Sequence, residues 1–196
     1  MTQTETAPAE GTRARVERAA LDLFTLRGFE QVTTDEVADA AGISRRTFFR
    51  YYATKADAVW GDFAGHVARL EALLAAAEPA QPVLASVCAA YVEVNDYADA
   101  ELPLLRERMH LILSEPALLA HSQVRHVEVD RAVARHVASR TGDSPTALVP
   151  RLVAATTRAA ATTAFEAWLA DPRSSLGRYL HLAFDEIMAG FPGLRR

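Results

Sequence analysis

The sequence predicts an all-α protein in which a small N-terminal helix-turn-helix unit precedes a larger helical body. Apolar residues recur with the period of an amphipathic helix along most of the chain, and no alternating strand pattern competes. Half of the residues are hydrophobic and glycine and proline number only nine each, so the chain can bury a substantial core. Two helix-start signals flank Gly42 near the N-terminus, which predicts a tight pair of helices there.

The N-terminal unit begins with a predicted helix over residues 13–27, which has apolar residues at helical spacing. A second helix is predicted to start at Thr33. Thr33 and Glu36 stand at the two positions of a capping box, and Val32 and Val37 stand at those of a hydrophobic staple.

The third helix is predicted to start at Ser44, a favourable N-cap residue. Ile43 and Phe48 stand where a second hydrophobic staple would pack. Gly42 suits the sharp turn before it, because glycine adopts the left-handed conformation without a Cβ penalty. Two helices separated by about three residues must cross at a steep angle, which is the helix-turn-helix geometry.

The third helix carries Arg45, Arg46 and Arg50, and residues 40–56 contain no acidic side chain. In a helix-turn-helix, the second helix of the pair enters the major groove, and its N-terminal residues meet base edges. An arginine there can make a bidentate contact to guanine. The alternative is that these arginines form an ordinary solvated helix face.

Hydroxyl groups lie beside these arginines. Ser44 and Thr47 offer hydroxyls to DNA phosphates, and the start of the helix itself attracts an anion. Tyr51 lies one turn further along the helix and can reach a base or a sugar.

Together with the preceding helix, this region resembles the TetR family of transcriptional regulators over about residues 12–60. The matching residues are Gly28-Phe29, Thr34, Val37-Ala38, Ala41-Gly42-Ile43-Ser44, Thr47, Phe49, Tyr52 and Lys55. The resemblance implies a nine-helix fold with a three-helix DNA-binding head and a helical body for ligand binding and dimerisation.

The resemblance also implies roles for single residues. Phosphate contacts are implied for Thr34, Thr47 and Lys55, and base contacts for Arg45, Arg46 and Tyr51. Phe49 departs from the family, which often has a tyrosine whose hydroxyl bonds a phosphate at this position. Phe49 can pack but cannot donate, and Arg50 beside it can supply a replacement contact.

The rest of the chain shows helical periodicity with breaks at proline and glycine. We expect helices over residues 54–77, 83–98, 101–113, 116–140, 145–170 and 175–190. Pro150 marks either a later start or a kink in the helix over 145–170. We therefore expect a disordered tail at 1–10, a DNA-binding domain at 11–55 and a ligand-binding and dimerisation domain at 56–196.

The last two predicted helices have the composition of a partner surface. The first is rich in alanine and threonine, which permit close helix approach, and it also carries Leu152, Val153, Phe165 and Trp168. The second sets an apolar stripe of Leu176, Leu180, Ala183, Phe184, Ile187 and Phe191 on one face. Both stripes can instead face their own core, but the resemblance favours a homodimer whose two heads read a near-palindromic DNA site.

The resemblance implies a small-molecule effector that binds the body and releases a repressor from its operator. The run from Val59 to Phe63, with the aromatic run 48–52 ahead of it, is similar to TetR-family members associated with the mycofactocin system, whose effectors are acyl-CoA-type molecules. Candidate residues for a hydrophobic or acyl-CoA-like ligand are Trp60, Phe63, Met109, Leu113, Phe165 and Trp168. Such residues are also common in plain protein core.

Charge and composition set further bounds. The net charge is −4, but residues 1–55 hold eight basic and eight acidic side chains, so the predicted head is neutral and its cationic patch is local. A single cysteine, Cys88, excludes an internal disulfide, and the six histidines show no metal-ligand spacing, so we expect neither a metal nor a cofactor. Residues 1–10 do not have the layout of a signal peptide and no long uncharged apolar run is present, which predicts a cytoplasmic protein.

An enzyme is the main alternative from another functional class, and a helical interaction protein that does not bind DNA is a third. The sequence contains no nucleophile elbow, phosphate-binding glycine loop or metal motif. Neither alternative accounts for the basic third helix, so a regulator rather than an enzyme is expected.

Overall fold

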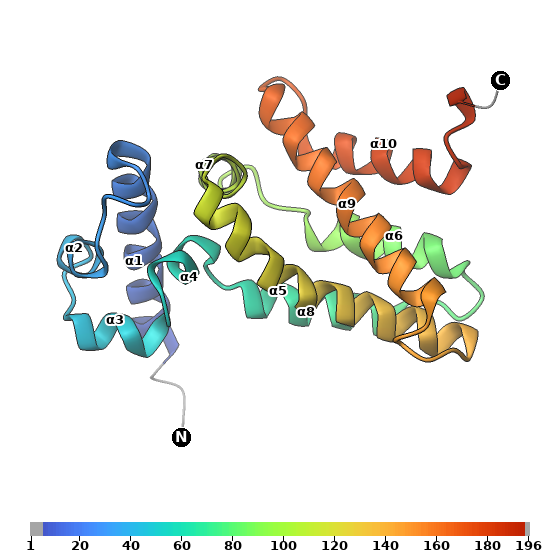
Figure 1. Ribbon diagram of the computed structural model, residues 1–196, viewed down its shortest axis with the longest axis horizontal. Helices are drawn as coiled ribbons and strands as arrows, with labels where there is room; N and C mark the ends of the chain where they lie inside the picture. The colour runs from blue at the N-terminus through green and yellow to red at the C-terminus, as the bar shows by residue number, and fades with distance from the viewer. Residues whose placement is uncertain (1–5, 195–196) are drawn as a thin grey trace. The chain divides into compact units, whose positions relative to one another are not determined.

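The computed structural model describes residues 6–194, which contain ten α-helices, one short 3₁₀ helix and no strand (Figure 1). The elements are α1 (Thr6–Arg27), α2 (Thr34–Ala40), α3 (Arg45–Tyr51), α4 (Lys55–Trp60), α5 (Phe63–Ala76), α6 (Val83–Val94), α7 (Leu102–Ser114), α8 (Pro116–Thr141), α9 (Leu148–Ala170), α10 (Leu176–Ala189) and η1 (Pro192–Leu194). The all-α prediction is confirmed.

The helices form two compact units. Among the described residues, the first comprises 6–63 together with 103–121, and the second comprises 64–102 and 122–194. The sequence led us to expect a boundary between residues 55 and 56, whereas the first unit also includes α4 and most of α7.

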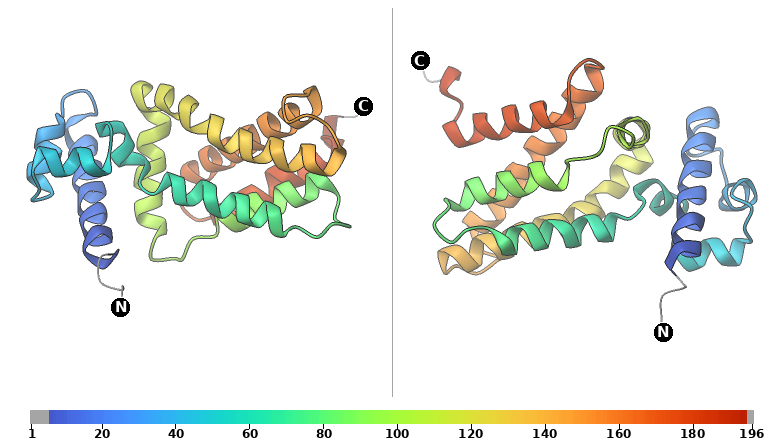
Figure 2. Two further views of the ribbon diagram at one scale, coloured as in Figure 1. Left: turned by 90° about the horizontal axis from the view of Figure 1, so that it is seen from below. Right: turned by 180° about the vertical axis from the view of Figure 1, so that it is seen from behind.

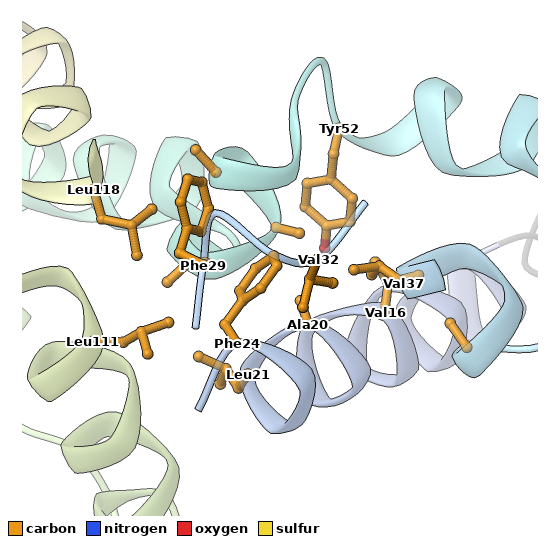
Figure 3. Packing of buried hydrophobic residues seen from close by; sticks show 14 of the residues in the cluster. Val16, Ala20, Leu21, Phe24, Phe29, Val32, Val37, Tyr52, Leu111 and Leu118 are labelled. Carbon is orange, nitrogen blue, oxygen red and sulfur yellow. The ribbon is translucent and has the colours of Figure 1, made fainter. Parts of the chain in front are cut away.

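The core of the first unit is built around α1, whose buried face follows the predicted helical spacing (Figure 3). Phe24 and Phe29 pack edge to face, with ring centroids 5.0 Å apart. Val32, Val37 and Phe48 are fully buried beside them, so both predicted hydrophobic staples contribute to the same core. Leu111 and Leu118, from α7 and α8, complete this core, which explains why these segments belong to the first unit.

The predicted helix over residues 54–77 is wrong as a single element, because it breaks into α4 and α5 at Gly61. Gly61 has φ +60° and ψ −137°, a conformation that only glycine adopts readily. A Cβ atom at this position would lie 2.8 Å from the Glu17 carboxylate and 3.1 Å from the Arg108 guanidinium. This break raises the count from the predicted nine α-helices to ten among the described residues.

Two other predicted boundaries shift. α1 begins at Thr6, so residues 6–10 of the predicted disordered tail are helical, whereas residues 1–5 lie outside the described part of the chain. Alanine and glutamate favour a helix in this stretch, and Pro8 is tolerated because it stands in the first turn. α9 begins at Leu148 rather than residue 145, and Pro150 occupies its first turn, which settles Pro150 as the mark of a later start.

In the second unit, α9 and α10 follow each other along the chain and pack together, and both also contact α6 (Figure 2). The apolar stripe on α10 faces inward at Leu176, Leu180 and Phe184, which are almost completely buried within this unit. Phe165 and Trp168 of α9 are buried in the same way. The expectation that these five side chains form a partner surface is therefore wrong, because the unit needs them for its own core.

No helix within residues 6–194 combines the length and the hydrophobicity that crossing a membrane requires.

Candidate nucleic-acid interface

The start of α2 shows the predicted capping box. The Thr33 hydroxyl accepts from the Glu36 amide at 3.2 Å, and the Thr33 amide donates to the Glu36 carboxylate at 2.8 Å. Arg27 also donates to Glu36, at 2.7 Å. These bonds from the Thr33 backbone and from Arg27 lower the pKa of Glu36 to about 2, so the cap stays charged and intact at neutral pH.

The turn between α2 and α3 is as tight as the sequence predicts. Gly42 has φ +67°, and its amide donates to the carbonyl of Asp39 at 3.0 Å. Arg15 of α1 donates to the carbonyl of Ala41 at 3.3 Å, which fixes the turn against the first helix. Ser44 then caps α3 by accepting from the Thr47 amide at 3.1 Å.

α3 buries one face and exposes the other. Phe48 is fully buried, whereas Arg45, Arg46, Phe49 and Arg50 are exposed. A surface hollow of about 430 Å³ is lined by Arg46, Thr47, Phe49 and Arg50. The exposed face therefore offers guanidinium groups, a hydroxyl and an apolar ring within one concave patch.

Arg45 is paired within the protein. Its guanidinium donates to both carboxylate oxygens of Asp35 at 2.8 Å and lies over the Phe49 ring, 5.3 Å from the centroid. Both partners of the ion pair are more than half exposed, and such pairs stabilise a fold by only ~0–1 kcal/mol. A stronger acceptor, such as a phosphate or a guanine edge, can therefore displace Asp35 at small cost.

Arg46 differs from its neighbours. Among the described residues, no carboxylate or aromatic ring engages its guanidinium, and the side chain is exposed at the N-terminal end of α3. Arg50, in contrast, stacks on Tyr51 at 5.0 Å and donates to its hydroxyl at 3.2 Å. Arg13 approaches the same ring at 5.7 Å, so two cations lie close to Tyr51.

Lys55 has a structural role that the resemblance did not indicate. Its ammonium donates to the backbone carbonyls of Phe29 and Val32, at 2.7 and 2.8 Å, and lies 4.3 Å from the Phe29 ring centroid. These contacts occupy two of its three donors and hold the connection between α1 and α2. One donor of the ammonium therefore remains for the predicted phosphate contact.

The hydroxyl residues lie at the helix starts. Thr34 is the first residue of α2 and is half-buried. The Ser44 and Thr47 hydroxyls are 2.9 Å apart and bond to each other while Ser44 caps α3. Phosphate contacts by these residues remain predictions that rest on their location beside the arginine face.

The six candidate effector residues divide between the two units. Trp60 and Phe63 pack edge to face at 5.2 Å in the first unit, where Trp60 and Met109 lie against the core and Leu113 is half-buried. Phe165 and Trp168 pack edge to face at 6.2 Å in the second unit. Phe165 and Trp168 belong to the buried core, and Trp60 and Met109 pack against it. A hollow of about 670 Å³ in the second unit is lined by other residues.

Polar contacts that join distant segments of the first unit could not be predicted from the sequence. Arg108 of α7 donates to Glu17 of α1 at 2.7 Å, and Tyr52 donates to the same carboxylate at 3.1 Å. Burial, together with the charge of Glu17, raises the pKa of Tyr52. His121 of α8 lies 3.0 Å from Asp57 of α4. Only the fold brings these partners together, since they are 35 to 91 residues apart in sequence.

Two family descriptions match the chain. The MftR C-terminal domain matches residues 81–192, and the bacterial regulatory proteins of the tetR family match residues 18–58. A Mycobacterium tuberculosis H37Rv protein described as a mycofactocin biosynthesis transcriptional regulator, MftR, is 37% identical over 185 residues, which cover 94% of this chain and 93% of the relative. The transcriptional regulator TcmR of Streptomyces glaucescens is 29% identical, covering 80% of this chain and 73% of TcmR.

Solved structures share the fold at low identity. The Thermus thermophilus repressor FadR, solved with lauroyl-CoA, has a TM-score of 0.56 and 22% identity, covering 91% of this chain and 94% of FadR. The SmeT–triclosan complex from Stenotrophomonas maltophilia has a TM-score of 0.63 and 18% identity, covering 91% of this chain and 90% of SmeT.

Proposed function

Because the chain belongs to the TetR family of DNA-binding transcriptional regulators and carries the MftR type of C-terminal domain, we propose that it is a ligand-responsive repressor. It binds a near-palindromic operator as a homodimer, and a small hydrophobic or acyl-CoA-like effector releases it. The observation that carries the proposal is the exposed face of α3, where Arg46 is free of internal partners among the described residues.

Each exposed side chain of α3 has a proposed task at the DNA. Arg46 reads a guanine edge in the major groove, and Arg45 joins it after leaving Asp35. The phosphate contacts come from Thr34, Ser44, Thr47 and Arg50, and Tyr51 reaches a base or sugar. Phe49 contributes apolar contact and a platform for Arg45.

Dimerisation is proposed through the outward faces of α9 and α10 rather than through the stripe that is buried. The outward face of α9 presents Leu148, Leu152, Ala155, Ala159 and Thr163, all exposed. On α10 the exposed apolar side chains are Leu182 and Met188, with Phe191 just beyond. Small residues allow two copies of α9 to approach closely about a two-fold axis. Two heads are needed because one neutral head carries only a local cationic patch.

The protein has one conformation that fits DNA and one that does not. Release requires that the effector bind the second conformation more tightly than the first. FadR was solved with lauroyl-CoA and SmeT with triclosan, and both ligands have large apolar parts, which supports this effector class. α4 is the proposed lever, since the Asp57–His121 contact ties it to α8 and the helix ends abruptly at Gly61.

The test is an Arg46→Ala substitution. Fluorescence anisotropy with DNA from the protein's own promoter region should show an affinity loss of at least about tenfold, because a bidentate arginine–guanine contact is worth ~1–3 kcal/mol. Arg69→Ala, which removes an exposed arginine from α5, is the matched control and should leave affinity unchanged. Size-exclusion chromatography should give a dimer for both. Equal affinity of the Arg46 variant and wild type for specific DNA would contradict the proposed reading helix.

A further inference from the structure

Two arginines from different helices meet at one tyrosine at the end of α3. The Arg50 guanidinium lies 5.0 Å from the centroid of the Tyr51 ring, and the Arg13 guanidinium lies 5.7 Å from the same centroid. Both distances are within the range of a cation–π interaction. Arg13 belongs to α1, outside the helix-turn-helix pair, so the fold adds a cation to the end of α3 that α3 itself does not carry.

The side of α1 that faces the end of α3 is fixed by Glu17. The Glu17 carboxylate accepts from the Tyr52 hydroxyl at 3.1 Å and from Arg108 at 2.7 Å. Arg13 lies four residues before Glu17, and residues four apart are neighbours on one side of a helix. Arg13 and Glu17 therefore meet the consecutive tyrosines 51 and 52, and the Glu17 contacts hold Arg13 beside the first of them.

Little negative charge offsets these two arginines within the protein. No carboxylate among residues 6–194 pairs with Arg50, which donates to the Tyr51 hydroxyl at 3.2 Å. Arg13 has an acidic neighbour in Asp62, but the two groups are 3.9 Å apart and the Asp62 side chain is 61% exposed. Exposed pairs of this kind add little to stability and are screened by salt. Two like charges held close together with so little compensation favour an anion from outside the chain.

The open face of α3 adjoins this arginine pair. Arg50 also lines the hollow of about 430 Å³ on that face, together with Arg46, Thr47 and Phe49. Arg13 and Arg50 are both exposed, so an anion can reach them without displacing any core side chain. A helix that reads base edges has the DNA backbone on either side of it, and each nucleotide of that backbone carries a phosphate.

We propose that Arg13 is a DNA-backbone contact, and that Arg13 and Arg50 bind operator phosphates from the two helices that meet at Tyr51. This inference rests on the proposed function, because it requires that α3 faces DNA. Guanidinium groups make strong charge-assisted hydrogen bonds with phosphate oxygens. Such a contact fixes the register of the head on the duplex but carries no sequence information. With Arg13, the cationic patch extends beyond α3 in a head whose net charge is zero.

The test measures how DNA affinity depends on salt. Wild type and Arg13→Gln are titrated by fluorescence anisotropy against DNA from the protein's own promoter region, between about 50 and 200 mM salt. Each phosphate contact steepens the dependence of log affinity on log salt by about 0.9, so a dimer that loses two Arg13 side chains should lose about 1.8 from its slope. The affinity advantage of wild type over Arg13→Gln should therefore shrink about tenfold across this salt range.

Arg18→Gln is the matched control, because it removes the same charge from the same helix. The Arg18 side chain is 47% exposed, as that of Arg13 is, but it pairs with Glu107 at 2.7 Å and with Asp22 at 3.4 Å. Arg18 lies five residues after Arg13, which places it on another side of α1. Arg18→Gln should leave the salt slope at the wild-type value.

Two further readouts separate a phosphate contact from a purely structural role of Arg13. Arg13→Lys keeps the charge and should restore most of the slope. Arg13→Gln should weaken binding to promoter DNA and to random-sequence DNA by the same factor, whereas Arg46→Ala should weaken binding to promoter DNA more. If Arg13 only supported the Tyr51 ring, Arg13→Gln would weaken binding without changing the salt slope, and this result would overturn the proposal.

The remaining outcomes are equally decisive. Circular dichroism and size-exclusion chromatography should show that each variant is folded and dimeric under the assay conditions. An equal loss of slope in Arg18→Gln would show that the effect is one of net charge, and it would overturn the phosphate contact. If wild type binds promoter DNA through Arg46 while Arg13→Gln keeps the full slope, this contact alone is refuted. If wild type binds no promoter DNA, the proposed function is refuted and the contact with it.

Discussion

Gly61→Ala is a sharp test of how the first unit is held together, because this glycine makes the break between α4 and α5. Its φ of +60° and ψ of −137° lie in a region that alanine enters only with strain. The added methyl group would also lie 2.8 Å from a Glu17 carboxylate oxygen and 3.1 Å from both terminal nitrogens of Arg108. Real Cβ atoms do not approach other atoms as closely as 2.8 Å, so the Glu17–Arg108 pair must move.

The expected loss has two parts. The backbone conformation alone costs about 1–3 kcal/mol for a residue other than glycine. The Glu17–Arg108 pair is 15% and 19% exposed, and breaking such a buried pair costs up to about 3–5 kcal/mol. Since both side chains end in flexible groups that can shift rather than separate, only part of the second figure applies. We expect a fall of about 2–5 kcal/mol in the free energy of unfolding.

Urea unfolding followed by circular dichroism measures this loss of unfolding free energy. Every variant is measured at the same protein concentration, because the stability of a dimer depends on concentration. Gly177→Ala is the control, because nothing lies within 4 Å of its added methyl group and it sits within α10, where alanine favours the helix by ~0.5–1 kcal/mol. In a Glu17→Ala background, Gly61→Ala should cost at least about 1 kcal/mol less, because part of the clash is gone. A loss below about 1 kcal/mol refutes the strain, and an unchanged loss in the Glu17→Ala background refutes the clash.

Three further outcomes are expected. Lys55→Met should lower the free energy of unfolding by about 2 kcal/mol, because two backbone carbonyls lose a charged donor. It should weaken DNA binding less than Arg46→Ala does. A larger loss of DNA affinity for Lys55→Met than for Arg46→Ala would show that Lys55 binds a phosphate. Phe49→Tyr should strengthen operator binding about twofold to tenfold in anisotropy titrations if its hydroxyl reaches a phosphate, with no change in salt dependence because no charge is added. Glu36 has a pKa of about 2 against an ordinary 4.5, so its contribution to stability is complete above about pH 4.5 and is lost as the pH falls toward 2. Glu36→Gln should therefore make the fall of Tm between pH 4.5 and pH 2 less steep. An unchanged slope of Tm against pH would contradict the role given to the cap.

The interface on α3 combines a rigid frame with weakly held contact groups. The frame is set by the Thr33–Glu36 and Ser44–Thr47 caps, which give the Glu36 and Thr47 amides a partner at the starts of α2 and α3. In the absence of DNA, the pairing with Asp35 holds the Arg45 guanidinium in a defined position. Such preordering reduces the side-chain entropy that DNA binding would otherwise cost.

The sequence by itself determined the features that depend on nearby residues. The capping box at Thr33, the left-handed turn at Gly42 and the cap at Ser44 are settled by contacts within about four residues, so their chemistry can be read from the order of side chains. The exposed character of Arg46 follows equally from its register relative to buried Phe48.

The tertiary structure alone decided the features that depend on distant partners. Helical spacing predicts one continuous helix through Gly61, and only the approach of Glu17 and Arg108 shows why the chain keeps a glycine and a break there. Lys55 matches a family position for phosphate binding, but the carbonyls it meets lie more than twenty residues away and capture its ammonium. The contact between His121 and Asp57 likewise depends on packing between helices, because the two residues are 64 positions apart in the sequence.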